Sequence, residues 1–398
     1  MIALLLRPEV QSFIREHERD DEKKLILSQR EIFGVPASVI AQQLVGRRKA
    51  KTKLPLYYHT SKIIFPPTLN LEQSSSEKTA SLKANLFCSM IGHDKIVADV
   101  TGGFGVDSFF FSRCYKKIIY VEPNLSLLEI ARHNHQTLSV TNIEYQQTTA
   151  EDFLHGTHES IDGIFIDPSR RNKTNQKVFR LSDCEPDVPK LLPALFQKAD
   201  CILIKTSPLL DIQQGIKTLQ NVEKVWIVSV DNECKELLFF CRKGFTKEPV
   251  MHAINLTDLA DEFSFTFEEE KNTVLNFSKP FTYLYEPNAS ILKAGAFKLV
   301  GKKFSVNKLA PNTHLYTSLN LLHDFPGRIF KIIQPVKPDP KILNEIFPGG
   351  KVNILIRNYP LSVEALKKKT KLKDGGEHYL IGFSGLSEKH LVAAERIK

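Results

Sequence analysis

The stretch that most constrains this chain runs from Lys95 to Glu122, KIVADVTGGFGVDSFFFSRCYKKIIYVE. Apolar runs at 96–100 and 118–121 predict two buried strands, with a glycine-rich turn and a helical segment between them. Gly103 and Gly105 have no side chain, so the backbone can pass close to a ligand there, and the helix that follows begins with free amide donors. The stretch therefore predicts half of a nucleotide-cofactor site.

Two cofactors compete for this turn. A dinucleotide fingerprint, G-x-G-x-x-G, needs a third glycine where this chain has Ser108. The residues from Asp99 to Gly105 instead fit D-x-T-x-G-x-G, in which an acid at the strand end faces a cationic methionine moiety. Glu122 lies about 20 residues past the glycines, where a carboxylate can accept ribose hydroxyls. The pattern favours S-adenosylmethionine, and the alternative is a glycine turn without a ligand.

An acid also follows the next predicted strand, at 143–146. Asp152 lies in the turn after it, at the same edge of the sheet. A carboxylate at that position can accept the exocyclic amine of adenine. By itself, however, Asp152 also fits the simpler interpretation of a helix-capping aspartate.

A polar turn with a proline, DPSRR, ends the fourth predicted strand, and we expect it to hold the catalytic residues Asp167, Pro168, Ser169 and Arg170. Ligands of open α/β sheets bind beyond the carboxyl ends of the strands, so this turn would face the transferred methyl group. Asp167 would orient or deprotonate an acceptor, while Arg170 and Arg171 would hold a phosphate or carboxylate. Lys205, after the next strand, would join the same rim. The alternative is a strand-ending turn whose arginines form salt bridges.

Strands and helices alternate from Ile96 as far as the strand at 225–230. The apolar run at 237–242 then returns after a short turn, which only an antiparallel neighbour can do, because a parallel crossover needs about a dozen residues or more. A mostly parallel sheet with one terminal antiparallel hairpin is the methyltransferase variant of the doubly wound sheet. The segments 352–357, 362–373 and 378–383 read as strand, helix and strand, with Gly375-Gly376 closing the helix, in a small α+β module.

Composition narrows the class of protein. At 398 residues, 42% hydrophobic and 25% charged, the chain is an ordinary globular protein of two or three domains. Six cysteines without a C-x-x-C pair predict reduced thiols in a cytosolic protein, with no disulfide framework and no zinc site. No run of 18 apolar residues predicts a membrane span, and no metalloprotease, serine-hydrolase or P-loop motif occurs. The net charge of +9 favours a polyanionic partner such as RNA.

Two basic runs carry part of this charge. Each is compatible with phosphate binding or with a solvated helix surface. They consist of Arg47, Arg48, Lys49, Lys51 and Lys53 in a helical N-terminal region, and of Lys367, Lys368, Lys369, Lys371 and Lys373 near the C-terminus. Ser74 and Glu77 fit a capping box at the start of a helix that runs to about Met90. This helix start either is a simple cap or lines the far end of the cofactor pocket.

With these residues in view, positions 97 to about 242 resemble a class I S-adenosylmethionine-dependent methyltransferase. The whole chain resembles the bacterial family of such enzymes with a C-terminal THUMP-like domain. The resemblance rests on IIFPPTLNLEQSSSEKTASLKA, DVTGGFGVD, DPSRR, YEPNASILKAGAF and RNYPLSVEALKKKTKLKDGGEHYLIG. It implies an α/β, Rossmann-like domain at 91–246 behind a helical region at 1–90, followed by a ferredoxin-like segment at 247–327 and a THUMP-like domain at 328–398.

The resemblance also implies ligands. It assigns S-adenosyl-L-methionine to Asp99, Thr101, Gly103, Gly105, Glu122, Asp152 and Asp167, and it suggests RNA as the substrate because related THUMP modules bind RNA. Amino-group methyltransferases have an Asn or Asp, two prolines and an aromatic residue where this chain has Asp167, Pro168, Ser169 and Arg170. The ring that would stack on a flipped base is therefore missing, which puts methylation of an exocyclic amine in doubt.

Three functions follow as hypotheses. The first is a cytoplasmic methyltransferase that uses S-adenosylmethionine on structured RNA, without a metal or a membrane. The second is methylation of a small acidic metabolite or a protein, with the arginine pair holding a carboxylate or phosphate. The third is a non-catalytic RNA-binding adaptor with a methyltransferase fold. Salt separates the first two, because binding to RNA phosphates weakens steeply as ionic strength rises.

Overall fold

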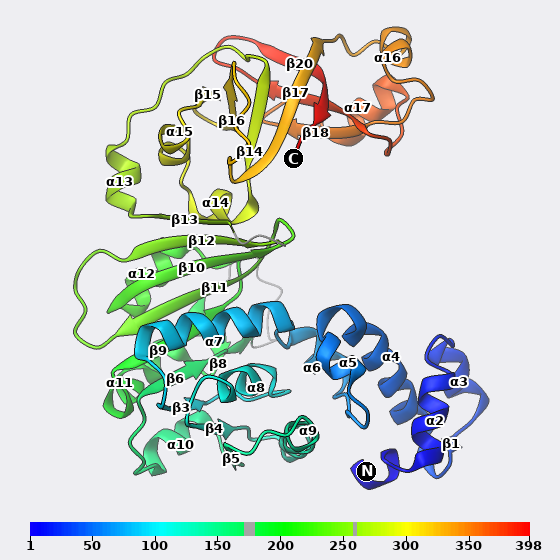
Figure 1. Ribbon diagram of the computed structural model, residues 1–398, viewed down its shortest axis with the longest axis vertical. Coiled ribbons are helices and arrows are strands. Elements are labelled where there is room, and N and C mark those ends of the chain that lie inside the picture. The colour runs from blue at the N-terminus through cyan, green and yellow to red at the C-terminus, as the bar shows by residue number, and fades with distance from the viewer. Residues whose placement is uncertain (171–179, 258–260) are drawn as a thin grey trace. The chain divides into compact units, whose positions relative to one another are not determined.

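The computed structural model describes residues 1–170, 180–257 and 261–398, without the side chains of Arg170 and Asp261 (Figure 1). The chain divides into two compact units. One unit comprises Met1–Glu223 and Leu238–Lys247, and the other comprises Lys224–Leu237 and Glu248–Lys398. The first unit contains the glycine turn and the DPSRR turn up to Arg170.

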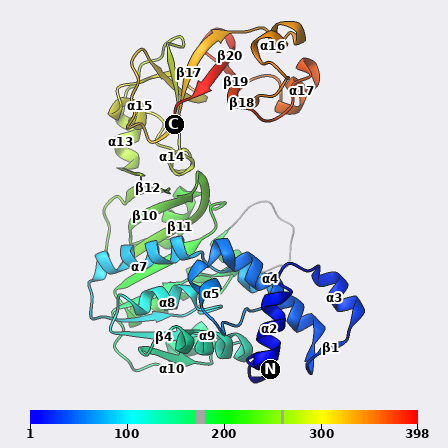
Figure 2. The ribbon, with the colours of Figure 1, turned by 45° about the vertical axis from the view of Figure 1, so that its right-hand side comes forward.

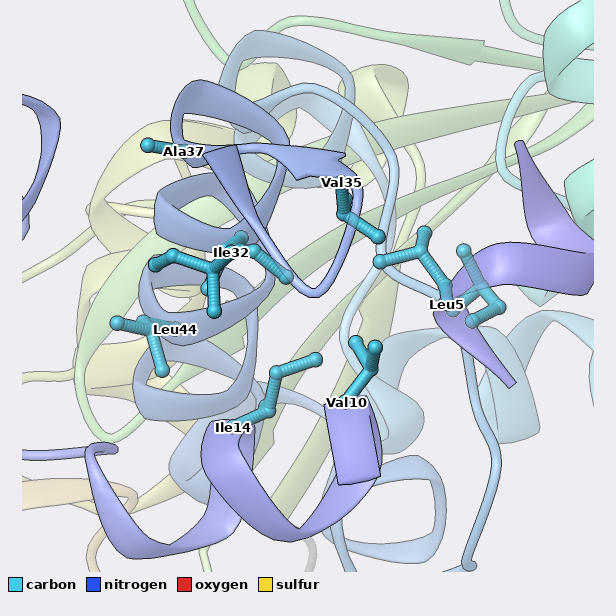
Figure 3. Close-up of a cluster of buried hydrophobic side chains, with 9 residues drawn as sticks. Leu5, Val10, Ile14, Ile32, Val35, Ala37 and Leu44 are labelled. Carbon is cyan, nitrogen blue, oxygen red and sulfur yellow. The ribbon is translucent and has the colours of Figure 1, made fainter. Parts of the chain in front are cut away.

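The first unit begins with a helical region. Its elements are α1 (Ile2–Leu5), α2 (Pro8–Glu16), α3 (Glu22–Ser28), β1 (Glu31–Ile32), β2 (Val35–Pro36), α4 (Ala37–Lys53), α5 (Pro55–His59) and α6 (Thr68–Gln73). Figure 3 shows the apolar side chains that join these elements. This cluster consists of Leu5, Val10, Ile14, Ile32, Val35, Ala37, Ile40, Leu44 and Ile64. The region therefore has a hydrophobic core of its own.

Apolar positions at helical spacing over 31–45 predict a helix there, but the first residues of that segment form a small hairpin. Phe33 and Gly34 have φ angles of +53° and +74°, which make a tight turn between β1 and β2. A right-handed helix cannot pass through two such residues. Helix α4 therefore begins only at Ala37.

A nine-stranded sheet follows, in the order β13-β12-β10-β11-β9-β6-β3-β4-β5. Its strands are β3 (Ile96–Asp99), β4 (Lys117–Val121), β5 (Ile143–Gln146), β6 (Gly163–Ile166), β9 (Cys201–Thr206), β10 (Val222–Val230), β11 (Glu233–Arg242), β12 (Val250–Leu256) and β13 (Asp261–Phe265). The pairs from β5 to β9 are parallel. Asp231 and Asn232, both with positive φ, form the turn between β10 and β11, so the predicted hairpin is present but its turn is shorter than the predicted 231–236. The predicted methyltransferase sheet is confirmed, and β12 and β13 extend it.

Among the described residues, the helices of this α/β part of the chain are α7 (Glu77–Ile91), α8 (Val106–Ser112), α9 (Leu125–Thr137), α10 (Ala150–Gly156), α11 (Val188–Lys198) and α12 (Ile212–Leu219). Figures 1 and 2 both show α7 and α8 side by side across one face of the sheet. The strand β6 is buried at every residue, as expected when helices cover both faces of a parallel sheet. A short ribbon of β7 (Ser169–Arg170) and β8 (Cys184–Glu185), with a 3₁₀ turn at Leu181–Asp183, follows β6.

The cap of α7 differs from the predicted one. Ser76, not Ser74, accepts a hydrogen bond from the amide of Thr79, and the Thr79 hydroxyl accepts one from the amide of Ser76. Glu77 is already inside the helix, and its carboxylate accepts the amide of Leu56 instead. The prediction of the helix was right and that of its capping residues was wrong.

The second unit contains a seven-stranded sheet in the order β15-β16-β14-β17-β20-β19-β18. Its elements are α13 (Phe267–Asn272), β14 (Tyr283–Pro287), α14 (Ala289–Ala294), α15 (Leu299–Lys303), β15 (Asn307–Ala310), β16 (Thr313–Ser318), β17 (Gly327–Pro335), α16 (Pro340–Ile346), β18 (Asn353–Arg357), α17 (Val363–Thr370), β19 (His378–Ser384) and β20 (Lys389–Arg396). β14 and β17 pair directly, so this sheet runs continuously across position 327.

One core lies within this sheet, built from Leu284, Leu309, Leu315, Phe330, Leu355, Ile381, Phe383, Val392 and Ala394. In β14, the buried Glu286 forms ion pairs with Arg328 and Arg357. Helix α17 ends at Thr370, with Lys371 in the left-handed region at φ +61°. Gly375 and Gly376 therefore lie in the following loop and do not close the helix as predicted.

Candidate functional site

Asp99 ends β3, at the bottom of the glycine turn. Its carboxylate accepts the amide of Thr101 at 3.1 Å and the hydroxyl of Ser108 at 2.6 Å, and only 1% of the residue is exposed. Burial raises the pKa of Asp99 to about 7, and the carboxylates of Asp107 and Asp167 raise it further, while its two hydrogen bonds oppose the rise. The acid expected to face a cation therefore titrates near neutral pH.

Glu122 follows β4 and closes on the same turn. One of its carboxylate oxygens accepts the amide of Gly103 at 2.9 Å, and the other accepts the amide of Asn124 at 2.9 Å. Burial raises the pKa of Glu122, and these two amides oppose the rise. Each oxygen keeps a second lone pair for another donor. The sequence-predicted partners, the glycine turn and the acid after β4, are thus brought into contact.

The turn is held tightly by aromatic neighbours. A Cβ atom on Gly102 would lie 2.3 Å from the ring of Tyr120, whose hydroxyl donates to the carbonyl of Gly103 at 2.6 Å. Gly105 has a φ of +81° and precedes α8. Its carbonyl accepts Nε2–H of the buried His135 at 2.8 Å, and the Tyr145 hydroxyl donates to Nδ1 of the same ring. Burial lowers the pKa of His135 to about 4, so the neutral ring acts as a clamp.

The DPSRR turn meets the glycine turn at Asp167. The amide of Asp167 donates to the hydroxyl of Thr101 at 2.7 Å, and its carboxylate forms an ion pair with Lys205 at the end of β9. The side chains of Asp167 and Lys205 are 27% and 14% exposed, so both can still be reached from solvent. Thr101, Asp167 and Lys205 therefore form one continuous wall at the carboxyl ends of β3, β6 and β9.

The remaining residues of that turn lie further out. Pro168 is buried, and the exposed Ser169 donates its hydroxyl to the carbonyl of Glu185 at 3.3 Å. The backbone of Arg170 pairs with Cys184 in the β7–β8 ribbon. The side chain of Arg170 and the whole of Arg171 lie outside the described residues. The predicted arginine grip on a phosphate or carboxylate therefore stays a prediction.

Asp152 lies in the first turn of α10. Its carboxylate accepts the Thr149 hydroxyl at 2.9 Å, while its amide donates to the same hydroxyl at 3.1 Å. The residue is exposed, and it lines a shallow depression together with Glu144, Gln146 and His158. This geometry fits a helix cap, and the adenine contact of Asp152 stays a prediction.

Sequence reasoning missed a buried network beside the glycine turn. Lys83 of α7 is fully buried, and its ammonium lies 3.2 Å from the carboxylate of Asp107 and 2.9 Å from the hydroxyl of Ser75. Ser75 in turn donates to Asp107 at 2.7 Å. Asp107 is the second residue of α8, directly after the glycines. An acid two residues past the last glycine was the only signal in the sequence, because no pattern indicates which lysine becomes buried.

The N-terminal basic run lies within α4 and is largely engaged with acids. Arg47, Arg48 and Lys49 form ion pairs with Glu18, Glu22 and Glu72, respectively, and Lys51 is exposed. The ammonium of Lys53 donates to the carbonyls of Leu71 and Glu72, both at 2.7 Å. Burial lowers the pKa of Lys53 to about 8, and the charge of Lys205 lowers it further. Most of this run therefore fastens helices to one another.

Within the described ranges, no group of three or more His, Cys, Asp or Glu side chains is arranged to hold a metal ion. Over the same part of the chain, each helix is too short or too polar to cross a membrane.

Comparison with known proteins adds two family matches. Residues 283–326 match a ferredoxin-like domain, and residues 327–396 match a THUMP domain-like family. No curated protein matches the chain by sequence.

Two solved structures resemble only part of the chain. PH1948, a candidate RNA methyltransferase from Pyrococcus horikoshii, is 14% identical with a TM-score of 0.37, over 50% of this chain and 98% of its own. SMU.1697c, a candidate methyltransferase from Streptococcus mutans in complex with SAH, is 14% identical with a TM-score of 0.30, over 40% and 94%. Both TM-scores are too low to support an assignment.

A third solved structure matches nearly the whole chain. It is that of a candidate methyltransferase from Porphyromonas gingivalis W83, which is 31% identical with a TM-score of 0.85 and covers 98% of this chain and 97% of its own. Its similarity therefore includes the glycine turn, the sheet and the C-terminal sheet together. This chain thus belongs to the same family, the bacterial methyltransferase-fold proteins with a C-terminal THUMP-like domain.

Proposed function

We propose that this protein is a cytoplasmic enzyme that transfers a methyl group from S-adenosyl-L-methionine to structured RNA. The observation that carries the proposal is the 2.7 Å hydrogen bond from the amide of Asp167 to the hydroxyl of Thr101. This bond joins the predicted cofactor turn to the predicted acceptor turn. A donor held by the first turn would therefore lie beside an acceptor held by the second.

The residues of the glycine turn fit this cofactor. Glu122 keeps acceptor capacity for two ribose hydroxyls, because each oxygen is committed to one backbone amide only. Asp99 provides a buried carboxylate whose ionised form would be favoured by a nearby sulfonium or ammonium group. Gly103 places backbone where a side chain would obstruct a ligand. Asp152 is the least supported member of the predicted set, since it is exposed and its contacts with Thr149 are those of a helix cap.

The acceptor side must align the acceptor and take up its proton. When bound, the cofactor would supply a methyl group attached to a cationic sulfur. A lone pair of the acceptor would attack the methyl carbon as the carbon–sulfur bond breaks. Asp167 would accept a hydrogen bond from the N–H or O–H of the acceptor and take up its proton, while Lys205 fixes the carboxylate. Alignment of the acceptor is the larger contribution, because the displacement must be in line.

RNA is the favoured acceptor for two reasons. The C-terminal region matches the THUMP domain-like family, and the chain carries a net charge of +9, which favours polyanions. A small acidic molecule would account for the arginine pair at 170 and 171 but would leave the C-terminal module without a role.

The test has two stages. Calorimetric titration should give binding of S-adenosylhomocysteine and none of NADH. The protein is then incubated with S-adenosylmethionine labelled in its methyl group and total RNA from cells that lack the protein. Label released by nuclease and not by protease supports the proposal. Label in protein or small molecules would contradict the RNA substrate, and bound cofactor without any transfer would favour the adaptor.

Asp167→Asn tests the acceptor turn. We expect its methyl-transfer rate to fall about 10²- to 10⁴-fold, because loss of a positioned proton acceptor removes that much catalysis. Affinity for S-adenosylhomocysteine should change far less, as calorimetry would show. Asp200→Asn is the matched control, since Asp200 is an exposed acid that contacts only Lys243 among the ion pairs of the described residues. An unchanged rate for Asp167→Asn would remove Asp167 from the mechanism.

A further inference from the structure

Positive charge is concentrated in one segment of the second unit. Residues 337–377 contain nine basic and five acidic residues, a net charge of +4, so about a tenth of the chain holds nearly half of its total of +9. Helices α16 and α17 lie side by side here (Figures 1 and 2). Buried residues that include Leu343, Leu366 and Leu372 anchor this segment. The basic residues therefore belong to a segment that has its own buried hydrophobic residues.

The fold brings Lys351 next to the C-terminal basic run, Lys367–Lys373. Lys351 pairs with Lys373 in an isolated parallel bridge, although 22 positions separate them in the chain. The amide of Val352 donates to the carbonyl of Lys373 at 2.9 Å, and the amide of Lys373 donates to the carbonyl of Gly350 at 2.8 Å. Two lysines therefore sit on directly neighbouring backbones.

These like charges are not neutralised by ion pairs within the part of the chain that the structure describes. Lys351, Lys371 and Lys373 are exposed, and none makes an ion pair with any residue that the structure describes. The nearby Asp374 is taken by Lys367 at 2.5 Å. Like charges on adjacent strands destabilise a fold, so a surface that keeps them without a counter-charge is suited to an anionic partner.

Two glycine pairs flank these lysines. Gly349 and Gly350 have φ angles of +83° and +64°, and Gly375 and Gly376 have φ angles of +122° and +80°. Asn353, the first residue of β18, holds the second glycine pair by donating its side-chain amide to the carbonyl of Gly376 at 2.8 Å. Positive φ favours glycine, and the absence of side chains allows a bulky backbone to approach the main chain closely.

We propose that this glycine-pair surface, formed by residues 349–351 and 371–376 with the exposed Lys368 and Lys369 of α17, binds the phosphodiester backbone of RNA. The inference rests on the proposed function and gives it a contact surface. Lysines act there as point charges on phosphates, so the surface positions RNA without reading its sequence.

The test compares two double variants of the full chain with equal loss of charge. Lys351→Gln with Lys373→Gln removes the paired lysines, while Lys302→Gln with Lys389→Gln removes two exposed lysines elsewhere in the same unit. Binding of a fluorescently labelled RNA hairpin is measured by anisotropy over a range of salt concentrations. Losing two phosphate contacts should reduce the slope of log K against log salt by about 1.4 to 1.8.

The outcomes separate this inference from the proposed function. A reduced slope in the first variant only, with S-adenosylhomocysteine affinity unchanged in calorimetry, supports the surface. Tight RNA binding with the same slope in both variants overturns the surface and leaves the RNA substrate standing. Failure of the parent protein to bind RNA while it binds vesicles of acidic phospholipid overturns both. Circular dichroism of each variant excludes loss of folding as the cause of weak binding.

Discussion

Asp99 shows how the site combines opposed demands within one residue. Its carboxylate is almost fully buried, yet it faces Asp107 and Asp167 as electrostatic neighbours, and its hydrogen bonds offset only part of this cost. A cation placed beside Asp99 would relieve the burial of its charge. A cationic ligand would therefore offset the unfavourable burial of this carboxylate.

A pH prediction follows from Asp99. Its pKa rises from 3.8 to about 7 in the folded chain, so the folded state keeps a proton that the unfolded chain loses as pH increases. The free energy of unfolding of the ligand-free protein should therefore fall between about pH 4 and pH 8, by up to about 4 kcal/mol from this group. Asp99→Asn should remove this loss, measured by urea denaturation at pH 5 and pH 8.

The control for this measurement is Glu129→Gln, an exposed acid on α9. It should keep the pH dependence of the parent. If Asp99→Asn also keeps that dependence, the carboxylate of Asp99 is already ionised at pH 5 and the argument fails. Ligand binding gives a second readout, because affinity for a cationic cofactor should increase with pH in the parent and stay flat in Asp99→Asn.

At the scale of elements, helices α7 and α8 are joined by a charge pair as well as by packing. Lys83 is on α7, Asp107 begins α8, and Ser75 precedes α7. The geometry of the glycine turn thus depends on the position of α7. The sequence of α7 alone does not indicate which of its residues faces Asp107. A buried ion pair of this kind stabilises little by itself, but removing one partner leaves the other charge buried without compensation.

Lys83→Met should destabilise the protein by about 3 to 5 kcal/mol, since Asp107 would lose its buried counter-charge. Lys78→Met, an exposed lysine on the same helix, should change the free energy of unfolding by less than about 1 kcal/mol. Both are measured by urea denaturation at pH 7. A cost for Lys83→Met as small as that of Lys78→Met would mean that Asp107 does not depend on Lys83 for its stabilisation.

At the scale of the whole molecule, the two units would have separate electrostatic tasks. The first unit contains the glycine turn, where most contacts are buried, and the second contains the exposed lysines around 351 and 373. Salt screens exposed charges strongly and buried ones weakly. Ionic strength should therefore separate binding of the cofactor from binding of RNA.

Raising salt from about 50 to about 200 mM should change S-adenosylhomocysteine affinity by less than about threefold. RNA binding should weaken by about 10³-fold or more if six or more phosphates are contacted. Calorimetry measures the first quantity and anisotropy the second, in the same buffers. Equal, shallow responses for both ligands would point instead to a small acidic substrate.

Several features could be read from the sequence because they depend on local chemistry. Apolar runs of strand length and a glycine turn require a buried strand and a tight bend wherever they occur. The contact of Glu122 with the glycine turn follows the same logic, since adjacent parallel strands end at one edge of the sheet. The hairpin after β10 was fixed by connection length alone.

Other features escaped this reasoning because competing residues were equally suitable. Ser74, Ser75 and Ser76 are consecutive, and only the path of the chain before α7 decided that Ser76 caps the helix while Ser75 contacts Asp107. The basic run in α4 gave no sign of its acidic partners, which come from α3, α6 and the residues after α2. Periodicity also failed at 31–36, where positive φ at Phe33 and Gly34 overrode an apolar pattern.

Local patterns in the sequence were enough to predict the strands of the parallel sheet, the glycine turn and the acids at the ends of β3, β4 and β6, since these depend on neighbouring residues and on the edge rule for parallel sheets. The burial of Lys83 against Asp107, the ion pair between Asp167 and Lys205, and the pairing of Lys351 with Lys373 depend on the tertiary structure. Each joins residues far apart in the chain. Such contacts are selected by packing of the whole unit, which no local pattern encodes.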